Sequence, residues 1–181
     1  QGHTEVAHRY RHVTVLQADM CGFTPLSATR PPEEVLGILG DLFGQFDELA
    51  ERVRVHKLKT IGDAYVVIGG AFDGLAKTAA GQRLAAARVV RLALAMNEVV
   101  AATAKEKGID IGVRIGVHSG MVMGGIIGTV RFHFDMWGGA VYGAVKMEET
   151  GEKLKVHVSD TTYDLIQHAF DVEPHTGHED T

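Results

Sequence analysis

Hydrophobic residues in this 181-residue chain follow two patterns: short apolar runs, and longer stripes repeated every three or four positions. Short runs rich in β-branched residues predict strands, and the repeated stripes predict helices. Strands are expected at 13–18, in a hairpin over 58–68, at 109–117 and 121–127 around a turn at 119–120, at 132–137 and at 156–159. Helices are expected at 31–49, 79–107, 139–150 and 159–170, with a loop at 69–78.

The order of these elements predicts the fold class. Hairpins alternate with intervening helices, which is typical of an α+β sandwich with a largely antiparallel sheet. Residues 1–11 are polar and rich in histidine, so we interpret them as a linker or as the end of an entering helix. Residues 12–172 then form one domain of ordinary size, and residues 173–181 form a C-terminal tail.

Composition excludes several classes of protein. Apolar residues make up 45% of the chain, which is enough for an ordinary core. The net charge is −5 and the basic residues do not cluster along the sequence, so we expect no nucleic-acid surface. The single cysteine, Cys21, cannot form an internal disulfide, which argues against a secreted scaffold.

The chain also lacks the features of a membrane segment. No run of about 18 apolar residues occurs, so we expect neither a membrane span nor membrane contact by this domain. The sequence begins at Gln1 with no signal-like start. We therefore interpret it as a cytoplasmic domain of a larger protein, and the sequence leaves open whether that protein is bound to a membrane.

Asp19 and Asp63 are the first candidates for chemistry. Each follows the apolar residues of a predicted strand, next to a turn marked by Gly22 or Gly62. Adjacent hairpin tips would bring the two carboxylates to one end of the sheet, where hard oxygen ligands suit Mg²⁺ bound to phosphate groups. Taken alone, an aspartate beside a turn glycine is also an ordinary structural choice.

The segments around these aspartates carry a family resemblance. In chain order they are DMCGFT at 19–24, PPEE at 31–34, KLKTIGDAY at 57–65, RIGVHSG at 114–120 and FDMWG at 134–138. Together they resemble the class III adenylyl and guanylyl cyclases, over almost the whole chain. The resemblance implies a ferredoxin-like α+β sandwich for residues 12–172. It also implies a second cyclase domain, identical or different, that binds head to tail with the nucleotide at the interface.

The resemblance assigns metal and phosphate contacts. Asp19, Met20 and Asp63 are expected to hold two Mg²⁺ (or Mn²⁺) ions, which activate the ribose 3′-hydroxyl and hold the triphosphate. Arg114 matches an arginine that contacts phosphate. Further substrate contacts are expected from the turn residues Cys21, Gly22, Phe23, Thr24 and Gly62.

Lys59 and Asp135 match the base-selecting pair of the family. A lysine can donate a hydrogen bond to a ring nitrogen of adenine, and an aspartate can accept one from its amino group. Family members that select guanine usually carry Glu and Cys at these positions. The pair therefore predicts ATP as the substrate and cyclic AMP as the product.

Two positions depart from homodimeric members of the family. Those cyclases carry an Asn and, four residues later, an Arg, where this chain has Tyr142 and Lys146. A spacing of four places both side chains on one helix face. Lysine keeps the positive charge but loses the guanidinium fork. The chain thus resembles the first half of a heterodimeric cyclase, which keeps the metal aspartates and needs a partner half for the Asn and Arg.

Two other functions remain open at this stage. The domain is either catalytically weak or inactive and serves dimerisation or regulation, or it is half of a guanylyl cyclase whose partner supplies the base-selecting pair. In the second case Lys59 and Asp135 would line a degenerate pocket that binds a regulator.

Overall fold

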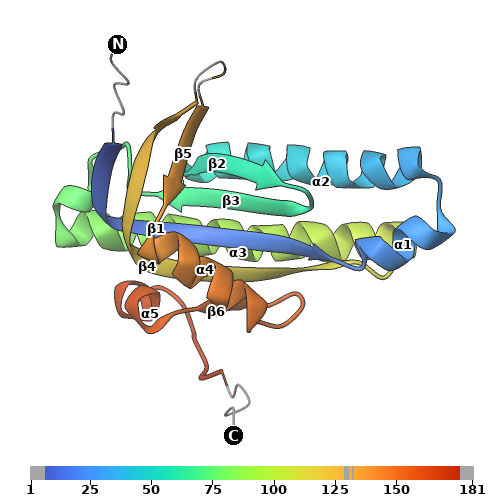
Figure 1. Cartoon of the computed structure of the whole chain (residues 1–181). Coiled ribbons are helices and arrows are strands. Elements are labelled where there is room, and N and C mark those ends of the chain that lie inside the picture. The colour runs from blue at the N-terminus through green and yellow to red at the C-terminus, as the bar shows by residue number, and fades with distance from the viewer. Residues whose placement is uncertain (1–6, 129–130, 132, 176–181) are drawn as a thin grey trace, which may run out of the picture.

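A computed structural model describes residues 7–128, 131 and 133–175, which form a six-stranded sheet with helices on both faces (Figure 1). The strands are β1 (Ala7–Cys21), β2 (His56–Ile61), β3 (Ala64–Gly69), β4 (Gly112–Ile127), β5 (His133–Trp137) and β6 (Val156–Val158). The helices are α1 (Phe23–Thr29), α2 (Pro32–Val53), α3 (Ala79–Lys107), α4 (Gly139–Glu149) and α5 (Asp160–Ile166), with a 3₁₀ turn, η1, at Leu75–Lys77.

The sheet has the strand order β2-β3-β1-β4-β5, and every pair along this path is antiparallel. The short strand β6 adds a parallel pairing with β4. The fold is therefore an α+β sandwich with a largely antiparallel sheet, as the element order predicted. None of the helices in the described part of the chain has the length and apolar character needed to cross a bilayer.

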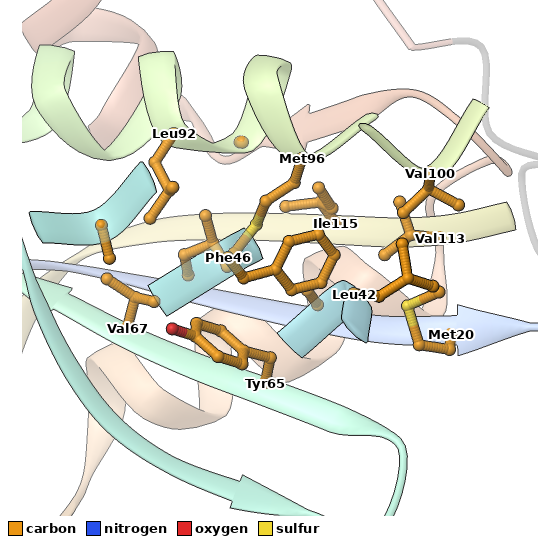
Figure 2. Packing of buried hydrophobic residues seen from close by; sticks show 14 of the residues in the cluster. Met20, Leu42, Phe46, Tyr65, Val67, Leu92, Met96, Val100, Val113 and Ile115 are labelled. Carbon is orange, nitrogen blue, oxygen red and sulfur yellow. The ribbon is translucent and has the colours of Figure 1, made fainter. Parts of the chain in front are cut away.

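Strand β1 contributes to two hydrophobic cores, one on each face of the sheet, because its side chains alternate between the two faces. Leu16 and Met20 join the larger core beneath α2 and α3, where Figure 2 shows Met20 near Leu42 and Val113. Val15 points to the opposite face and joins the smaller core beneath α4. Helices α2 and α3 thus cover one face and α4 the other (Figure 1).

Gly116 lets α4 lie directly on β4. A Cβ atom at this position would overlap the backbone nitrogen of Glu148 and the carbonyl oxygen of Ala144. Any larger residue would push the helix away from the strand. This close approach places Glu148, in the last turn of α4, against the sheet.

Two predicted features are wrong. The strands at 109–117 and 121–127 are one continuous strand, β4, with no turn at 119–120. Ser119 and Gly120 instead pair with Thr14 and Val13 of β1, and the Ser119 hydroxyl shares hydrogen bonds of 2.8 Å with Thr14 and Thr162. Residues 7–11, expected as part of a linker or helix end, form the first part of β1, because pairing with β4 outweighs their polar composition.

Smaller differences concern element ends. Residues 23–29 form α1, which the hydrophobic pattern did not predict, and η1 lies inside the expected loop at 69–78. Helix α5 ends at Ile166, whereas the pattern predicted an end near Phe170. Residue 132 of the strand expected at 132–137, residues 1–6 of the expected linker and residues 176–181 of the expected tail lie outside the described residues.

Candidate active site

Asp19 and Asp63 lie side by side at one end of the sheet. Asp19 is in β1, opposite Ala64 in the β1–β3 register, and Asp63 is in the turn between β2 and β3. The backbone amide of Met20 donates to the Asp63 carbonyl oxygen at 3.2 Å, which ties that turn to β1. Burial, and then the neighbouring charge of Asp63, raise the pKa of Asp19 to about 6. Two neighbouring carboxylates repel each other when both are ionised, which is the physical reason that the charge of Asp63 raises the pKa of Asp19.

This pair fits a divalent cation. Two crowded carboxylates gain from a cation between them, and hard cations such as Mg²⁺ bind carboxylate and phosphate oxygens. Residues 7–128, 131 and 133–175 contain no cluster of three or more His, Cys, Asp or Glu side chains arranged for a metal. Substrate phosphates and water would therefore complete the coordination. The Met20 side chain is buried in the core (Figure 2), so only its backbone carbonyl is available as a ligand.

Arg114 lies next to the aspartates and is held by Glu148. It pairs with Asp19 in the β1–β4 register, so the two side chains share one face of the sheet. Its Nε atom donates to Oε1 of Glu148 at 3.0 Å, and its Nη2 atom lies 2.9 Å from the same oxygen in a salt bridge. The Glu148 side chain is 4% exposed, and burial raises its pKa although Arg114 opposes that shift. The predicted phosphate-contacting arginine is thus oriented by a buried carboxylate.

Sequence reasoning missed Glu148, although a signal was present. Ala140, Ala144 and Glu148 are spaced by four and lie on the buried face of α4. A glutamate on the apolar stripe of a helix is unusual, because a buried carboxylate needs a partner. Searching that stripe for a charge would have found Glu148, but only the fold identifies Arg114 as its partner.

Gly22 directs the chain from β1 into α1. Its φ of +89° lies in the left-handed region, and a Cβ there would overlap the carbonyl oxygen of Asp110. The Phe23 side chain is buried, so the substrate contact predicted for this residue could come only from its backbone, whereas Thr24 is exposed. Burial raises the pKa of the Cys21 thiol, which keeps it protonated and argues against a nucleophile.

Gly62 forms the tip of the turn that carries Asp63. Its φ of +58° is also left-handed, and open space surrounds the position where a Cβ would lie. The glycine is therefore required by the turn conformation. Its backbone is exposed beside Asp63, where it is accessible to a bound molecule.

Lys59 and Asp135 meet although they belong to the two edge strands of the main sheet. Strands β2 and β5 are at opposite ends of the strand order, but the sheet curls so strongly that they approach each other (Figure 1). Lys59 Nζ donates to Asp135 Oδ1 at 2.7 Å, and the amide of Met136 donates to the same oxygen at 2.8 Å. Burial by itself would raise the pKa of Asp135, but these hydrogen bonds outweigh it and the pKa is lowered.

Tyr142 and Lys146 do not join this constellation. They lie on the outer face of α4, opposite the buried positions of that helix, and both are exposed. The Tyr142 side chain is among the most exposed large hydrophobic residues, at 71%. Neither side chain can turn through the helix toward Asp19 and Asp63 of the same chain.

Comparison with known proteins identifies the family. Residues 5–179 match the family described as Adenylate and Guanylate cyclase catalytic domain. The chain belongs to this cyclase family. The class III cyclase resemblance noted from the sequence motifs is therefore confirmed, and the chain is a nucleotidyl cyclase catalytic domain.

Relatives of this cyclase domain include both substrate classes. The chain is 35% identical over 161 residues to adenylate cyclase type 9 of Gallus gallus, and 31% identical over 166 residues to a membrane guanylyl cyclase of Dictyostelium discoideum. These alignments cover 89% and 92% of the chain but only 12% and 11% of the relatives. Family membership alone therefore does not choose between ATP and GTP.

A solved structure shares the fold over most of its length. It is the catalytic core of a rhodopsin-guanylyl cyclase with converted specificity, in complex with ATPαS. The TM-score is 0.80 at 33% identity, and the match covers 92% of this chain and 86% of that one.

Proposed function

We propose that this cyclase domain converts ATP into 3′,5′-cyclic AMP and pyrophosphate, at an interface with a second cyclase domain that supplies an Asn and an Arg. The observation that carries the proposal is the adjacency of Asp19 and Asp63 at the sheet end, together with the Lys59–Asp135 pair. The first pair suits a metal-bound triphosphate, and the second suits adenine.

Asp19 and Asp63 would hold two Mg²⁺ or Mn²⁺ ions. Bound there, the ions supply neutralisation of the phosphate charge and lower the pKa of the ribose 3′-hydroxyl. The protein's own task is to keep both carboxylates at this position before substrate arrives. Antiparallel pairing of β1 with β3 and the hydrogen bond from Met20 to Asp63 do so.

Arg114 would bind a phosphate oxygen. Its ion pair with Glu148 uses Nε and Nη2, so the remaining guanidinium nitrogen can donate to the substrate. The buried carboxylate of Glu148 already holds the Arg114 side chain in one orientation. The side chain therefore loses less conformational entropy when substrate binds. Glu148 is therefore a positioning residue, which acts on the substrate through Arg114.

Lys59 and Asp135 would read the base. Asp135 uses Oδ1 for Lys59 and for the amide of Met136, so Oδ2 can accept a hydrogen bond from the adenine amino group. The ammonium group of Lys59 has three protons, and one that is not donated to Asp135 can go to a ring nitrogen. A relative with converted specificity that is described in complex with ATPαS supports an ATP-compatible scaffold.

A second domain is needed because Tyr142 and Lys146 face away from the aspartates of their own chain. The residues that stabilise the ribose and the transferred phosphoryl group must then come from another chain, and this chain has Tyr and Lys at the matching positions. We also propose a cytoplasmic location, where an unpaired thiol such as that of Cys21 remains reduced.

The proposal is tested by assaying the purified domain with Mn²⁺ or Mg²⁺ and either ATP or GTP, alone and with a second-half cyclase domain. We expect cyclic AMP to form from ATP mainly in the mixed sample. Strong turnover by the domain alone would contradict the need for a partner, and a preference for GTP would replace ATP as the substrate. If nucleotide binding shows no dependence on metal, the domain is regulatory.

A further inference from the structure

Four arginines line one hollow at the end of α2. The hollow has a volume of about 280 Å³ and is bounded by Arg52, Val53, Arg54, Arg88 and Arg91. The first three residues come from the last turn of α2 and the residue after it, and the other two come from α3. The basic residues look dispersed along the sequence, but the packing of α2 on α3 gathers four of them.

These arginines have no acidic partner within the described ranges. No carboxylate of residues 7–128, 131 and 133–175 lies within 4.0 Å of their guanidinium groups. Arg91 makes a cation–π contact, in which its Cζ lies 6.0 Å from the centre of the Phe170 ring. Like charges gathered in one hollow repel each other, so an anion between them would lower the free energy.

Helix ends account for only part of the cluster. Arg52 and Arg54 lie at the C-terminal end of α2, where the helix dipole favours positive charge. Arg88 and Arg91 are near the middle of α3, far from either end of that helix. Their charges gain nothing from a helix terminus, and both residues line the same hollow as the two arginines from the end of α2.

Four guanidinium groups in one hollow favour a compact, multiply charged oxyanion, and a phosphate group is such an anion. Guanidinium groups bind phosphate oxygens in pairs, with a geometry that ammonium groups cannot provide. The volume is just below the range of about 300–1,000 Å³ that is usual for drug-sized ligands. None of the described residues that line the hollow is aromatic, so among them a nucleobase would find no ring on which to stack. The site suits one or a few phosphate groups without a nucleoside.

We propose that this arginine hollow binds a small, multiply charged phosphate group, either a free polyphosphate anion or the phosphorylated headgroup of a lipid. The hollow is separate from the cyclase site. Arg54 precedes β2, whereas Asp63 follows its far end, and a six-residue strand spans roughly 20 Å.

The test is calorimetric titration of the full chain with inorganic tripolyphosphate in EDTA, so that no cation occupies Asp19 and Asp63. We expect saturable binding that is weakened about tenfold or more by Arg88→Gln and by Arg52→Gln. Arg88→Lys should give an intermediate Kd, because it keeps the charge but loses the fork. Arg83→Gln, exposed on α3 outside the hollow, and Asp63→Asn should bind like the wild type.

Two further measurements complete the test. Thermal melting of each variant checks that the fold is retained. Sedimentation with vesicles that contain phosphatidylinositol bisphosphate distinguishes the sources: Arg88-dependent binding to vesicles identifies a lipid headgroup, and its absence beside tripolyphosphate binding identifies a free anion. If folded Arg88→Gln and Arg52→Gln bind tripolyphosphate and vesicles like the wild type, or if the wild type binds neither, the proposal is overturned. Since the titration contains no metal or nucleotide, its result is independent of the cyclase activity.

Discussion

The two faces of α4 serve opposite purposes. The inner face packs on the sheet and carries Glu148, whose carboxylate is buried and holds Arg114 beside Asp19. The outer face carries Tyr142 and Lys146, which are exposed to solvent. Residues on the inner face are positioned by contacts within the chain, so their geometry exists before any partner binds. Residues on the outer face can act only on another molecule, and their chemistry has to be tested in an assembly.

The largest effect is expected at the aspartate pair. Asp63→Asn removes one of the two charges that would bind the cations, so cyclic AMP formation with a second-half domain should fall by about 10³-fold or more. Product formation at saturating Mn²⁺ measures the loss. Asp41→Asn, exposed on α2, is the matched control and should retain activity. An active Asp63→Asn variant would remove the sheet-end site from the mechanism.

The outer face of α4 is tested by gain of function. Tyr142→Asn combined with Lys146→Arg supplies both residues that homodimeric cyclases carry, and an arginine acting on a phosphoryl group is worth about 10³-fold or more. We expect cyclic AMP formation by the chain alone to rise by up to about 10³-fold. Sedimentation should first show that the variant dimerises. A dimer without increased turnover would mean that the outer face is not the missing half of the site.

Base selection is tested at the pair joining the sheet edges. Lys59→Glu combined with Asp135→Cys removes the donor and acceptor proposed for adenine, so the ratio of ATP to GTP turnover should fall by about ten- to a thousandfold. Initial rates with both nucleotides measure this ratio. Lys57→Gln, two positions earlier on β2, is the control that should leave it unchanged. An unaltered ratio in the double variant would assign base selection to other residues.

The inner face of α4 is tested by stability. Glu148→Gln leaves the Arg114 guanidinium without its counter-charge, and the free energy of unfolding should fall by about 1–3 kcal/mol because Arg114 remains partly solvated. Urea denaturation measures the change. The neighbouring Glu149→Gln is exposed and should cost less than about 0.5 kcal/mol. Equal effects of the two changes would contradict a special role for the buried ion pair.

The smallest effect concerns pH. Burial lowers the pKa of His118, whose Nδ1 lies 2.7 Å from the Ser159 hydroxyl, so the unfolded chain takes up this proton more readily than the folded one. The contribution of neutral His118 to the free energy of unfolding is therefore fully present above about pH 7. It is lost as the pH drops through about 6.5 toward the folded pKa. His118→Asn should flatten the loss of thermal midpoint between about pH 7.5 and 5.5, whereas exposed His168→Asn should not. An unchanged slope in His118→Asn would exclude this titration.

Local pattern predicted most of the elements. The long helix at 79–107 agrees with α3 at both ends, because Thr78 caps it at 3.0 Å to the amide of Gly81 and Gly108 ends it with a left-handed φ. Prediction failed where partners distant in the sequence decide the structure. The segment at 119–120 looks like a turn, but Ser119 extends β4 because its hydroxyl has buried partners on β1 and α5.

The order of residues along the chain was sufficient to select its chemical groups: two aspartates beside turn glycines, a lysine and an aspartate for the base, and an altered pair on a late helix. Such signals depend on near neighbours and on periodicity, which are readable without a fold. The meeting of Lys59 with Asp135, the pairing of Arg114 with Glu148 and the gathering of four arginines depend on the curl of the sheet and on helix packing. Those contacts join segments far apart in sequence, so they appear only when the whole chain has folded.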